Sequence, residues 1–277
     1  PKSTIRTTSS VWYLPSCIIV WGMGVSLVFY VIVCKCRHYK LNLQHTTPTF
    51  DNVILFFPTM TDNIIKDTLL KYFPAIDEET IGKYIKMADL YREWNAKINV
   101  ISRTDIDNVF EHHILHSLSL AAFLGPLKEG TRIFDLGTGG GFPGIPLAVF
   151  YPHCQFHLID RIGKKIRVAN EIADSIGLAN VSFQHGDSGE CHERFDYVVS
   201  RAVMALGALA SIAMRNVASC KGKGYANRYS PGIVCLKGGD LADEIEAANR
   251  AVFDVPVSDF FSEPFFKTKS IVYVPKC

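Results

Sequence analysis

The sequence predicts an α/β protein with a doubly wound, mostly parallel sheet and a helical cap on its N-terminal side. Two observations support this fold class. From residue 126 onward, short apolar stretches alternate with amphipathic ones, as strands and helices do in such sheets, and a glycine-rich loop follows the first strand directly. Before that, residues 77–98 carry apolar side chains at three- and four-residue spacing, which is typical of an amphipathic helix.

The expected elements follow one another in a regular order. The helical leader contains helices over 77–98 and 107–124, and Gly125 and Pro126 end the second of them. Strands are expected at residues 132–135, 155–160, 181–185, 195–200, 232–236, 252–261 and 270–274. Helices are expected between them at residues 146–150, 164–176, 206–217 and 240–248.

The glycine-rich loop is the most informative motif in the chain. Residues 131–144 read Thr-Arg-Ile-Phe-Asp-Leu-Gly-Thr-Gly-Gly-Gly-Phe-Pro-Gly, so an apolar strand ends at Asp135 and then breaks into glycines. Glycine lets the backbone turn tightly and approach a ligand that a Cβ would repel. The next strand ends in Asp160, roughly twenty residues on, a spacing that suits a carboxylate holding a ribose hydroxyl of a nucleoside cofactor.

Two registers of this loop indicate different cofactors. Gly137, Gly139 and Gly141 form the G-x-G-x-G pattern of S-adenosylmethionine (SAM) methyltransferases, whereas residues 139–144 formally match the dinucleotide pattern G-x-G-x-x-G. The dinucleotide register fits less well, because it starts late after the strand and contains Pro143. The charge of Asp135 would also face a pyrophosphate, whereas it tolerates the cationic SAM. We therefore expect SAM; another nucleotide and a glycine turn without a ligand are the alternatives.

Composition limits the remaining chemistry. The formal net charge is only +2, so a nucleic-acid partner has to be met by a local basic patch. The eight cysteines show no C-x-x-C pair and no zinc spacing, which predicts free thiols in a reducing cytosol. His112, His113 and His116 lack the carboxylate of an H-E-x-x-H motif, so we expect no metal site; one of them is expected to contact phosphate or to cap the cofactor site.

Residues 1–59 form an atypical N-terminal extension. No charged residue occurs between Val11 and Cys34, and this hydrophobic segment, 11–34, is long enough to cross a bilayer with its basic flank in the cytoplasm. Helix-capping residues follow Met60, so the functional protein is expected to start there. The extension is then either an over-extended reading frame or a membrane anchor. The expected division is 1–59, a helical cap over 60–125, and the sheet domain over 126–277.

Motifs in several regions resemble one family. Besides the glycine loop, they are Asn-Ala-Lys-Ile-Asn-Val-Ile-Ser at 95–102, Glu-His-His-Ile-Leu-His-Ser at 111–117, Val-Val-Ser-Arg-Ala at 198–202 and Leu-Lys-Gly-Gly at 236–239. Together with Gly-Thr-Gly-Gly-Gly-Phe-Pro-Gly-Ile-Pro at 137–146 they resemble the bacterial guanine-N7 methyltransferases of small-subunit ribosomal RNA, RsmG or GidB. The resemblance covers about residues 60–274.

The resemblance implies a class I methyltransferase fold, SAM as the cofactor and a guanine N7 in 16S rRNA of the small ribosomal subunit as the target. Carried over by position, Gly137, Phe142 and Arg201 contact the cofactor. The family also uses a backbone pair after the third strand, which aligns best with Ser188 and Gly189. In this chain the acid usual at that place is displaced or lost, within residues 187–190.

The predicted chemistry needs few catalytic groups. Guanine N7 has a free lone pair and no proton to lose, so its methylation requires alignment rather than a general base. Arg201 follows a strand at the ligand-binding edge of the sheet, where it is expected to orient a carboxylate or phosphate or to bond guanine O6. An ion pair with Asp135 or Asp196 is the alternative. Lys237 is expected to neutralise an rRNA phosphate, or to be an exposed lysine at a strand end.

Two other functions stay open from the sequence. The first is a class I methyltransferase acting on a small molecule or a protein, and the second is a non-catalytic SAM-binding module, membrane-tethered through residues 11–34. We expect a cytoplasmic monomer that acts on the small subunit. The stretch Phe-Phe-Lys-Thr-Lys at 265–269 mixes aromatic residues and lysines as RNA contacts do, although a hairpin between closing strands explains it equally well.

Overall fold

The computed structural model describes residues 10–14, 17–24, 27–34, 60–201, 204–220 and 227–277. The chain forms two compact units, residues 1–64 and 65–277. In the first, strands β1 (Ser10–Leu14), β2 (Cys17–Gly24) and β3 (Leu27–Cys34) pair in this order as an antiparallel sheet, which covers the uncharged segment noted in the sequence. Among the described residues, no helix is long and apolar enough to span a membrane. Residues 35–59 of the predicted extension lie outside the described residues.

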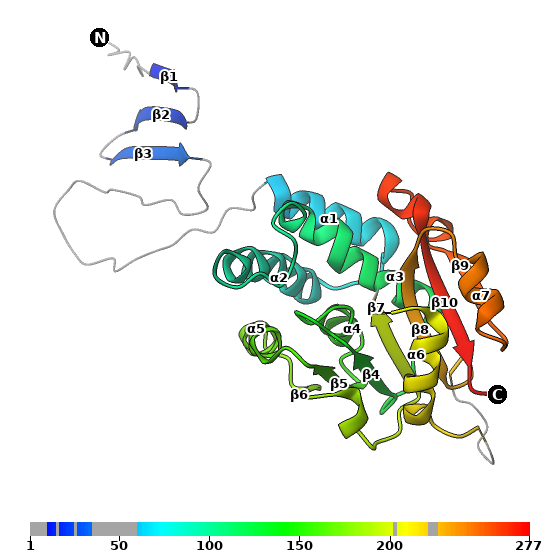
Figure 1. Ribbon diagram of the computed structural model, residues 1–277. Coiled ribbons are helices and arrows are strands. Elements are labelled where there is room, and N and C mark those ends of the chain that lie inside the picture. The colour runs from blue at the N-terminus through cyan, green and yellow to red at the C-terminus, as the bar shows by residue number, and fades with distance from the viewer. Residues whose placement is uncertain (1–9, 15–16, 25–26, 35–59, 202–203, 221–226) are drawn as a thin grey trace, which may run out of the picture. The chain divides into compact units, whose positions relative to one another are not determined.

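The second unit is built around a sheet that has seven strands in the described part of the chain. Strands β6, β5, β4, β7 and β8 lie side by side in this order and run parallel, and β10 and β9 follow at the edge, with β10 antiparallel to both its neighbours (Figure 1). The bounds are β4 Arg132–Leu136, β5 Gln155–Asp160, β6 Val181–His185, β7 Tyr197–Arg201, β8 Gly232–Gly238, β9 Phe253–Pro256 and β10 Lys269–Pro275. The structure confirms the doubly wound, mostly parallel sheet.

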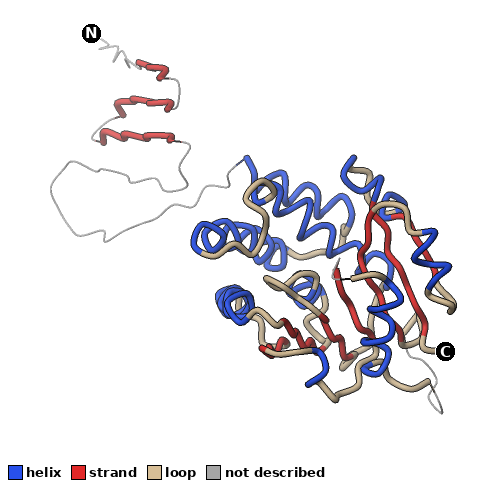
Figure 2. Tube along the Cα trace, in the orientation of Figure 1, coloured by secondary structure: helices blue, strands red, loops and turns tan. Residues whose placement is uncertain are grey.

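Helices cover both faces of this sheet (Figure 2). Their bounds are α1 Met60–Tyr72, α2 Glu78–Lys97, α3 His116–Leu124, α4 Gly144–Phe150, α5 Gly163–Ser175, α6 Leu206–Ala213 and α7 Ala242–Ala247. Because side chains alternate along each strand, the sheet buries two hydrophobic cores. Ile133 and Val199 join the core of α2 to α5, while the neighbouring Phe134 and Val198 join the core of α6.

Three expected elements differ from the structure. The helix expected over 107–124 is a 3-10 turn (Ile106–Asn108), a π-helix (Val109–Leu115) and then α3. The helix expected over 206–217 ends at Ala213, and a 3-10 turn follows in which the Asn216 side chain donates to the carbonyls of Cys191 and Glu193. The strand expected over 252–261 stops at Pro256, where the missing N–H ends the ladder and a 3-10 turn begins.

The helical cap is joined to the sheet by buried hydroxyl groups. The hydroxyl of Tyr84 donates to the carbonyl of Pro146 at 2.9 Å, and the hydroxyl of Tyr91 donates to the carbonyl of Gly140 at 2.7 Å. Both tyrosines lie on α2 and are fully buried, as the spacing of apolar residues predicts. The cap therefore packs directly against the glycine-rich loop and the helix that follows it.

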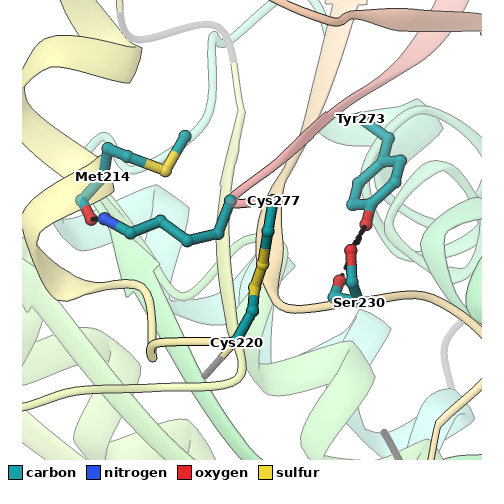
Figure 3. Close-up of a disulfide and its surroundings, with 6 residues drawn as sticks. Met214, Cys220, Ser230, Tyr273 and Cys277 are labelled. Atoms are coloured by element: carbon teal, nitrogen blue, oxygen red, sulfur yellow. Dashed lines mark hydrogen bonds between the residues drawn. A yellow bond between two sulfur atoms is a disulfide. The ribbon is translucent and has the colours of Figure 1, made fainter. Parts of the chain in front are cut away.

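One cysteine pair contradicts the expectation of free thiols. Cys220 and Cys277 form a disulfide with Cα atoms 6.4 Å apart (Figure 3). Cys220 precedes β8 and Cys277 follows β10, and these two strands pair antiparallel with Gly232 opposite Pro275, so the fold brings the two cysteines to the same end of the sheet. Their separation of 57 residues left no local pattern in the sequence. Cys154, Cys191 and Cys235 are buried free thiols.

Removing the Tyr84 hydroxyl tests the junction between cap and sheet. We expect Tyr84→Phe to lower the free energy of unfolding by about 1 kcal/mol, the net worth of one buried hydrogen bond. Tyr229→Phe is the matched control, because this hydroxyl has no hydrogen-bond partner among the described residues. Chemical denaturation measures both, and equal stabilities of the two variants would contradict a structural role for the Tyr84 bond.

Candidate functional site

The sheet topology places a switch point, where doubly wound sheets form a ligand-binding crevice, at the carboxyl ends of β4 and β7. From β4 the chain continues to β5 and β6 on one side, whereas β7 and β8 lie on the other side of β4. Ligands of doubly wound sheets bind at such a switch point. The glycine-rich loop follows β4, Asp160 ends β5 and Arg201 ends β7, so the fold brings the predicted residues of three strands to one edge.

The glycines of the loop serve two different purposes. Gly137, Gly139 and Gly141 have positive φ angles of 73°, 58° and 109°. A Cβ on Gly141 would collide with Ile145 and would lie 2.9 Å from the Tyr91 hydroxyl, so this glycine is needed for packing. Around Gly139, in contrast, no heavy atom of the described residues lies within 4 Å of the Cβ position. Gly139 therefore borders open space that a ligand can enter.

Asp135 holds the loop together and keeps one oxygen unused. Its Oδ2 accepts hydrogen bonds from Thr138 Oγ1 at 2.5 Å and from the Gly144 N–H at 2.8 Å. Its Oδ1 is buried and has no hydrogen-bond partner among the described residues. Burial raises the pKa of Asp135 to about 7, although the bonds from Thr138 and Gly144 oppose this. An unpaired buried carboxylate oxygen fits a cationic ligand group such as an ammonium or a sulfonium.

Asp160 lies where a ribose is expected. Its Oδ2 accepts from the Gly139 N–H and its Oδ1 from the Ile162 N–H, both at 2.8 Å, so the side chain joins the glycine loop to the turn after β5. Each oxygen keeps a further lone pair for a hydroxyl donor. Ile162 is an exposed large apolar residue on the same turn, with 42% of its surface accessible. Such a surface suits the face of a nucleobase.

The segment with Ser188 and Gly189 lies beside this turn. Arg161 pairs with Asp187 at 2.6 Å, and the Gly186 N–H donates to the carbonyl of Asp160 at 3.1 Å. Ser188–Glu190 form a 3-10 turn with a capping box, in which the Gly189 N–H donates to Asp187 at 2.7 Å and Glu190 accepts from the Asp187 N–H at 2.8 Å. Glu190 thus folds back on its own turn, and the Gly189 N–H already has a protein acceptor.

Phe142 of the glycine-rich loop and Arg201 at the end of β7 contact each other. Phe142 is buried and stacks on Tyr91 with ring centroids 4.4 Å apart. The Arg201 guanidinium carbon lies 4.9 Å from the centroid of the same ring, and its Nη1 donates to the His112 carbonyl at 3.4 Å. Burial lowers the pKa of Arg201 to about 10, while the carboxylate of Asp135 limits the decrease, so Arg201 stays charged near neutral pH. The result is a positioned, desolvated donor.

Lys237 is placed differently from a free strand-end lysine. Its ammonium donates to the carbonyl of Met204 at 2.6 Å and pairs with Glu244 at 2.7 Å, and only 9% of its side chain is exposed. The hydrogen bond from Lys237 also lowers the pKa of Glu244. The same Glu244 oxygen accepts from the Leu206 N–H, so Lys237 joins β8 to α7 and to the start of α6.

A second polar cluster adjoins the crevice, and the sequence pattern identified only its histidines. Asp105 Oδ1 lies 2.5 Å from His112 Nδ1, and Asp105 Oδ2 lies 2.7 Å from His113 Nε2. The His113 ring is 5.2 Å from the ring of Phe142. Offsets of seven and eight residues across a π-helix leave no periodic signal for this pairing. Within the described ranges, no group of three or more histidine, cysteine, aspartate or glutamate residues could hold a metal ion.

Comparisons with known proteins identify the family to which this chain is similar. Residues 78–266 match the family model described as GidB, rRNA small subunit methyltransferase G. The chain is 48% identical over 207 residues to the ribosomal RNA small subunit methyltransferase G of Bacteroides thetaiotaomicron, which spans 75% of this chain and 98% of that protein. It is 49% identical over 208 residues to the protein of the same name from Phocaeicola vulgatus, spanning 75% and 97%. Among solved structures, the magnesium protoporphyrin IX methyltransferase of Synechocystis PCC 6803 aligns over 72% of this chain and 98% of its own at 14% identity and a TM-score of 0.47, too distant to carry an argument.

A pair of glycine substitutions tests the open space in the crevice. We expect Gly139→Ala to raise the Kd for SAM roughly 10- to 100-fold, because a methyl group placed against a bound ligand costs about 1–3 kcal/mol. Gly130→Ala is the matched control, since Gly130 also has a positive φ and no neighbour within 4 Å but lies outside the crevice. Both variants should lose about 1 kcal/mol of stability from backbone strain. Equal SAM affinity by calorimetry would place the cofactor elsewhere.

The raised pKa of Asp135 predicts that the affinity for SAM depends on pH. Below about pH 7 the folded protein holds this carboxyl protonated, and a neutral carboxyl attracts a cationic ligand less. The ratio of the SAM affinity of the wild type to that of Asp135→Asn should therefore rise by up to about tenfold per pH unit until pH 7 and then level off. Titration calorimetry between pH 5 and pH 8 measures this ratio, with the folding of each variant checked by denaturation. A ratio that does not change with pH would exclude Asp135 as the partner of the cation.

The same group has the opposite effect on the protein without its ligand. A carboxyl whose pKa is raised in the folded state contributes stability at pH values below its unfolded pKa, and that contribution is lost as the pH rises through about 7. We expect the wild type to lose stability relative to Asp135→Asn over this range in the absence of SAM. A stability difference that is constant with pH would contradict the burial of an ionisable Asp135.

Proposed function

Because the chain belongs to the rRNA small subunit methyltransferase G (GidB) family, we propose that it transfers the methyl group of SAM to N7 of a guanine in 16S rRNA of the small ribosomal subunit. The observation that supports this most is the crevice at the switch point. There, the open space at Gly139 and the unpaired oxygen of Asp135 adjoin the positioned guanidinium of Arg201. Cofactor groups and target groups thus meet at one edge of the sheet.

The residues of the crevice fit each part of SAM. Gly137, Gly139 and Gly141 let the backbone approach the cofactor, and the carboxylate of Asp135 attracts its cationic end. Asp160 accepts the ribose hydroxyls, and the exposed Ile162 offers an apolar face to the adenine. Ser188 and Gly189 border the adenine from the neighbouring turn. When bound, SAM supplies an electrophilic methyl group.

The target side has to align a nucleophile that is already active. Guanine N7 carries its own lone pair, so no protein group has to remove a proton before methyl transfer. Arg201 is placed to donate to the guanine O6, the acceptor next to N7, or to a phosphate. Phe142 and Tyr91 keep water from one side of this place, since both rings are buried and stacked.

Lys237 has a less direct link to the target. Two of its three N–H groups already bond to Met204 and Glu244. A contact with an rRNA phosphate would use the third, and the exposure of only 9% of the side chain weighs against it. The ion pair with Glu244 supports a different role, in which Lys237 holds α6 and α7 against β8 and so shapes the target side.

The chemistry also bears on where the protein works. Bacterial ribosomal RNA is assembled in the cytoplasm, so we place the activity there, with the small subunit or its rRNA as the partner. Nucleophilic attack by N7 needs no metal ion, and one crevice in one chain contains the proposed groups, which supports a monomeric, metal-independent enzyme. Methyl transfer to a small molecule or to a protein, and SAM binding without catalysis, are the other outcomes of the test below.

The test combines labelled SAM with an identified product. The full-length chain is incubated with methyl-labelled SAM and small ribosomal subunits from a strain that lacks this methylation, with stripped rRNA in parallel. We expect label in N7-methylguanosine after digestion, and Arg201→Ala should lower the rate roughly 100- to 1000-fold, as does loss of one preorganised donor. Label in another nucleoside would contradict N7 as the target. SAM binding without any transfer to RNA would contradict the rRNA assignment.

Two further variants in the same assay separate the roles of Lys237. Contact with a phosphate predicts that Lys237→Ala impairs the use of RNA while Glu244→Ala does not. A structural role of the ion pair predicts that both variants lose similar activity and similar stability. Wild-type activity on rRNA and wild-type stability in both variants would exclude the phosphate contact and the structural role of the ion pair alike.

A further inference from the structure

Asp105 differs from the other carboxylates of the site in being both accessible and oriented. About a third of its side chain, 32%, is exposed, whereas Asp135 is fully buried. Each of its oxygens has one protein donor, His112 Nδ1 for Oδ1 and His113 Nε2 for Oδ2. A carboxylate oxygen has two lone pairs, so each oxygen keeps one for a ligand. Asp105 can therefore accept two parallel hydrogen bonds from outside the protein.

The two histidines hold this carboxylate in place and in its charged form. The His113 Nδ1 atom is buried without a partner among the described residues, which is acceptable only for a neutral ring that carries its proton on Nε2. Consistently, burial and then the charge of Arg201 lower the pKa of His113 to about 4. Burial would raise the pKa of Asp105, but the hydrogen bonds from both histidines outweigh it and lower that pKa. His112 is itself stacked on Phe265, with ring centroids 3.7 Å apart.

Asp105 and Arg201 are linked through His112. Arg201 donates to the His112 carbonyl and lies over the ring of Phe142, and the His113 ring lies 5.2 Å from that ring. The charge of Asp105 opposes the burial that lowers the pKa of Arg201 to about 10. The π-helix therefore links the two charged groups: its His112 carbonyl accepts from Arg201, and its His112 and His113 rings hold Asp105.

A guanidinium donor and a carboxylate acceptor match the polar groups around a guanine. N7 and O6 are neighbouring acceptors, and N1–H and the 2-amino group follow as neighbouring donors. A base with N7 at the cofactor and O6 at a guanidinium presents N1–H and the 2-amino group to whatever comes next. A carboxylate with two free lone pairs accepts both, whereas the N1 of adenine is itself an acceptor and would be repelled.

We propose that Asp105 selects guanine as the target base by accepting hydrogen bonds from its N1–H and 2-amino groups, with His112 and His113 as positioning residues. This inference rests on the proposed function and names the specificity residue of the same site. It requires the target to be unpaired when it is bound, because pairing would occupy the same edge of the base.

Removal of one functional group from the target base tests the contact between Asp105 and the 2-amino group. Small subunits are reconstituted with 16S rRNA that carries inosine in place of the target guanosine, which removes only the 2-amino group and leaves N7 intact. For the full-length wild type we expect kcat/KM for inosine to be roughly 10- to 100-fold lower than for guanosine, as for the loss of a hydrogen bond to a charged group. Asp105→Ala should be slow with guanosine and should no longer distinguish it from inosine.

Two controls separate selection of the base from a structural role. Asp107→Ala removes an exposed aspartate of the same segment and should keep the preference for guanosine. Asp105→Asn keeps the size of the side chain but replaces one acceptor with a donor, so it should lose the preference even where Asp105→Ala folds poorly. SAM affinity, measured by calorimetry, should stay unchanged in all three variants. His113→Phe, which removes one donor to Asp105, should reduce the preference for guanosine.

The possible outcomes are distinct. If wild-type protein methylates guanosine and inosine equally well, or if Asp105→Asn and Asp105→Ala keep the full preference, the selection by Asp105 is wrong while the proposed function stands. If wild-type protein transfers no methyl group to guanosine in the subunit, the proposed function itself fails.

Discussion

The buried carboxylate of Asp135 is the constraint on which the site depends. It receives the Thr138 hydroxyl and the Gly144 N–H, and so it closes the glycine-rich loop onto the end of β4. A Cβ on Gly144 would lie 2.7 Å from the same carboxylate oxygen, which explains why the loop needs a glycine at its far end. Burying this charge is unfavourable, as the raised pKa shows, and a cationic ligand offsets that cost. The same carboxylate of Asp135 thus fixes the shape of the loop and favours a cationic ligand.

Phe142 and Arg201 contact each other between the proposed cofactor side and the proposed target side. Phe142 belongs to the glycine-rich loop but stacks on Tyr91 of the cap. The guanidinium group of Arg201, at the end of β7, lies over the same Phe142 ring. Arg201 also reaches the π-helix through the His112 carbonyl. Arg201 therefore contacts the glycine-rich loop and the π-helix while it belongs to β7. A substitution at Arg201 changes contacts in all three elements, and this is why we treat it as the centre of the site.

The parts of this picture that the sequence predicted depend on local patterns. Alternating strands and helices, the glycines after Asp135 and the acid at the end of β5 are all readable within short windows, and they were enough to place Asp160 and Arg201 at one edge. The missed features depend on tertiary structure. Lys237 meets Glu244 across a turn, Asp105 meets two histidines across a π-helix, and Cys220 meets Cys277 only because β8 and β10 pair. A π-helix keeps the apolar pattern of an α-helix, so the sequence predicts an α-helix over residues 109–115.

The contact between the cap and the glycine-rich loop means that the sequences of these two segments have to match. Tyr91 caps the Gly140 carbonyl, and a Cβ on Gly140 would lie 2.9 Å from Val100, so the floor of the cofactor loop is supplied by residues that precede the sheet in the chain. Residues 65–277 correspondingly form one compact unit. The cap thus supports the glycine-rich loop directly rather than lying over it as a separate cover. Exchange of the cap between relatives would have to carry the matching glycine loop with it.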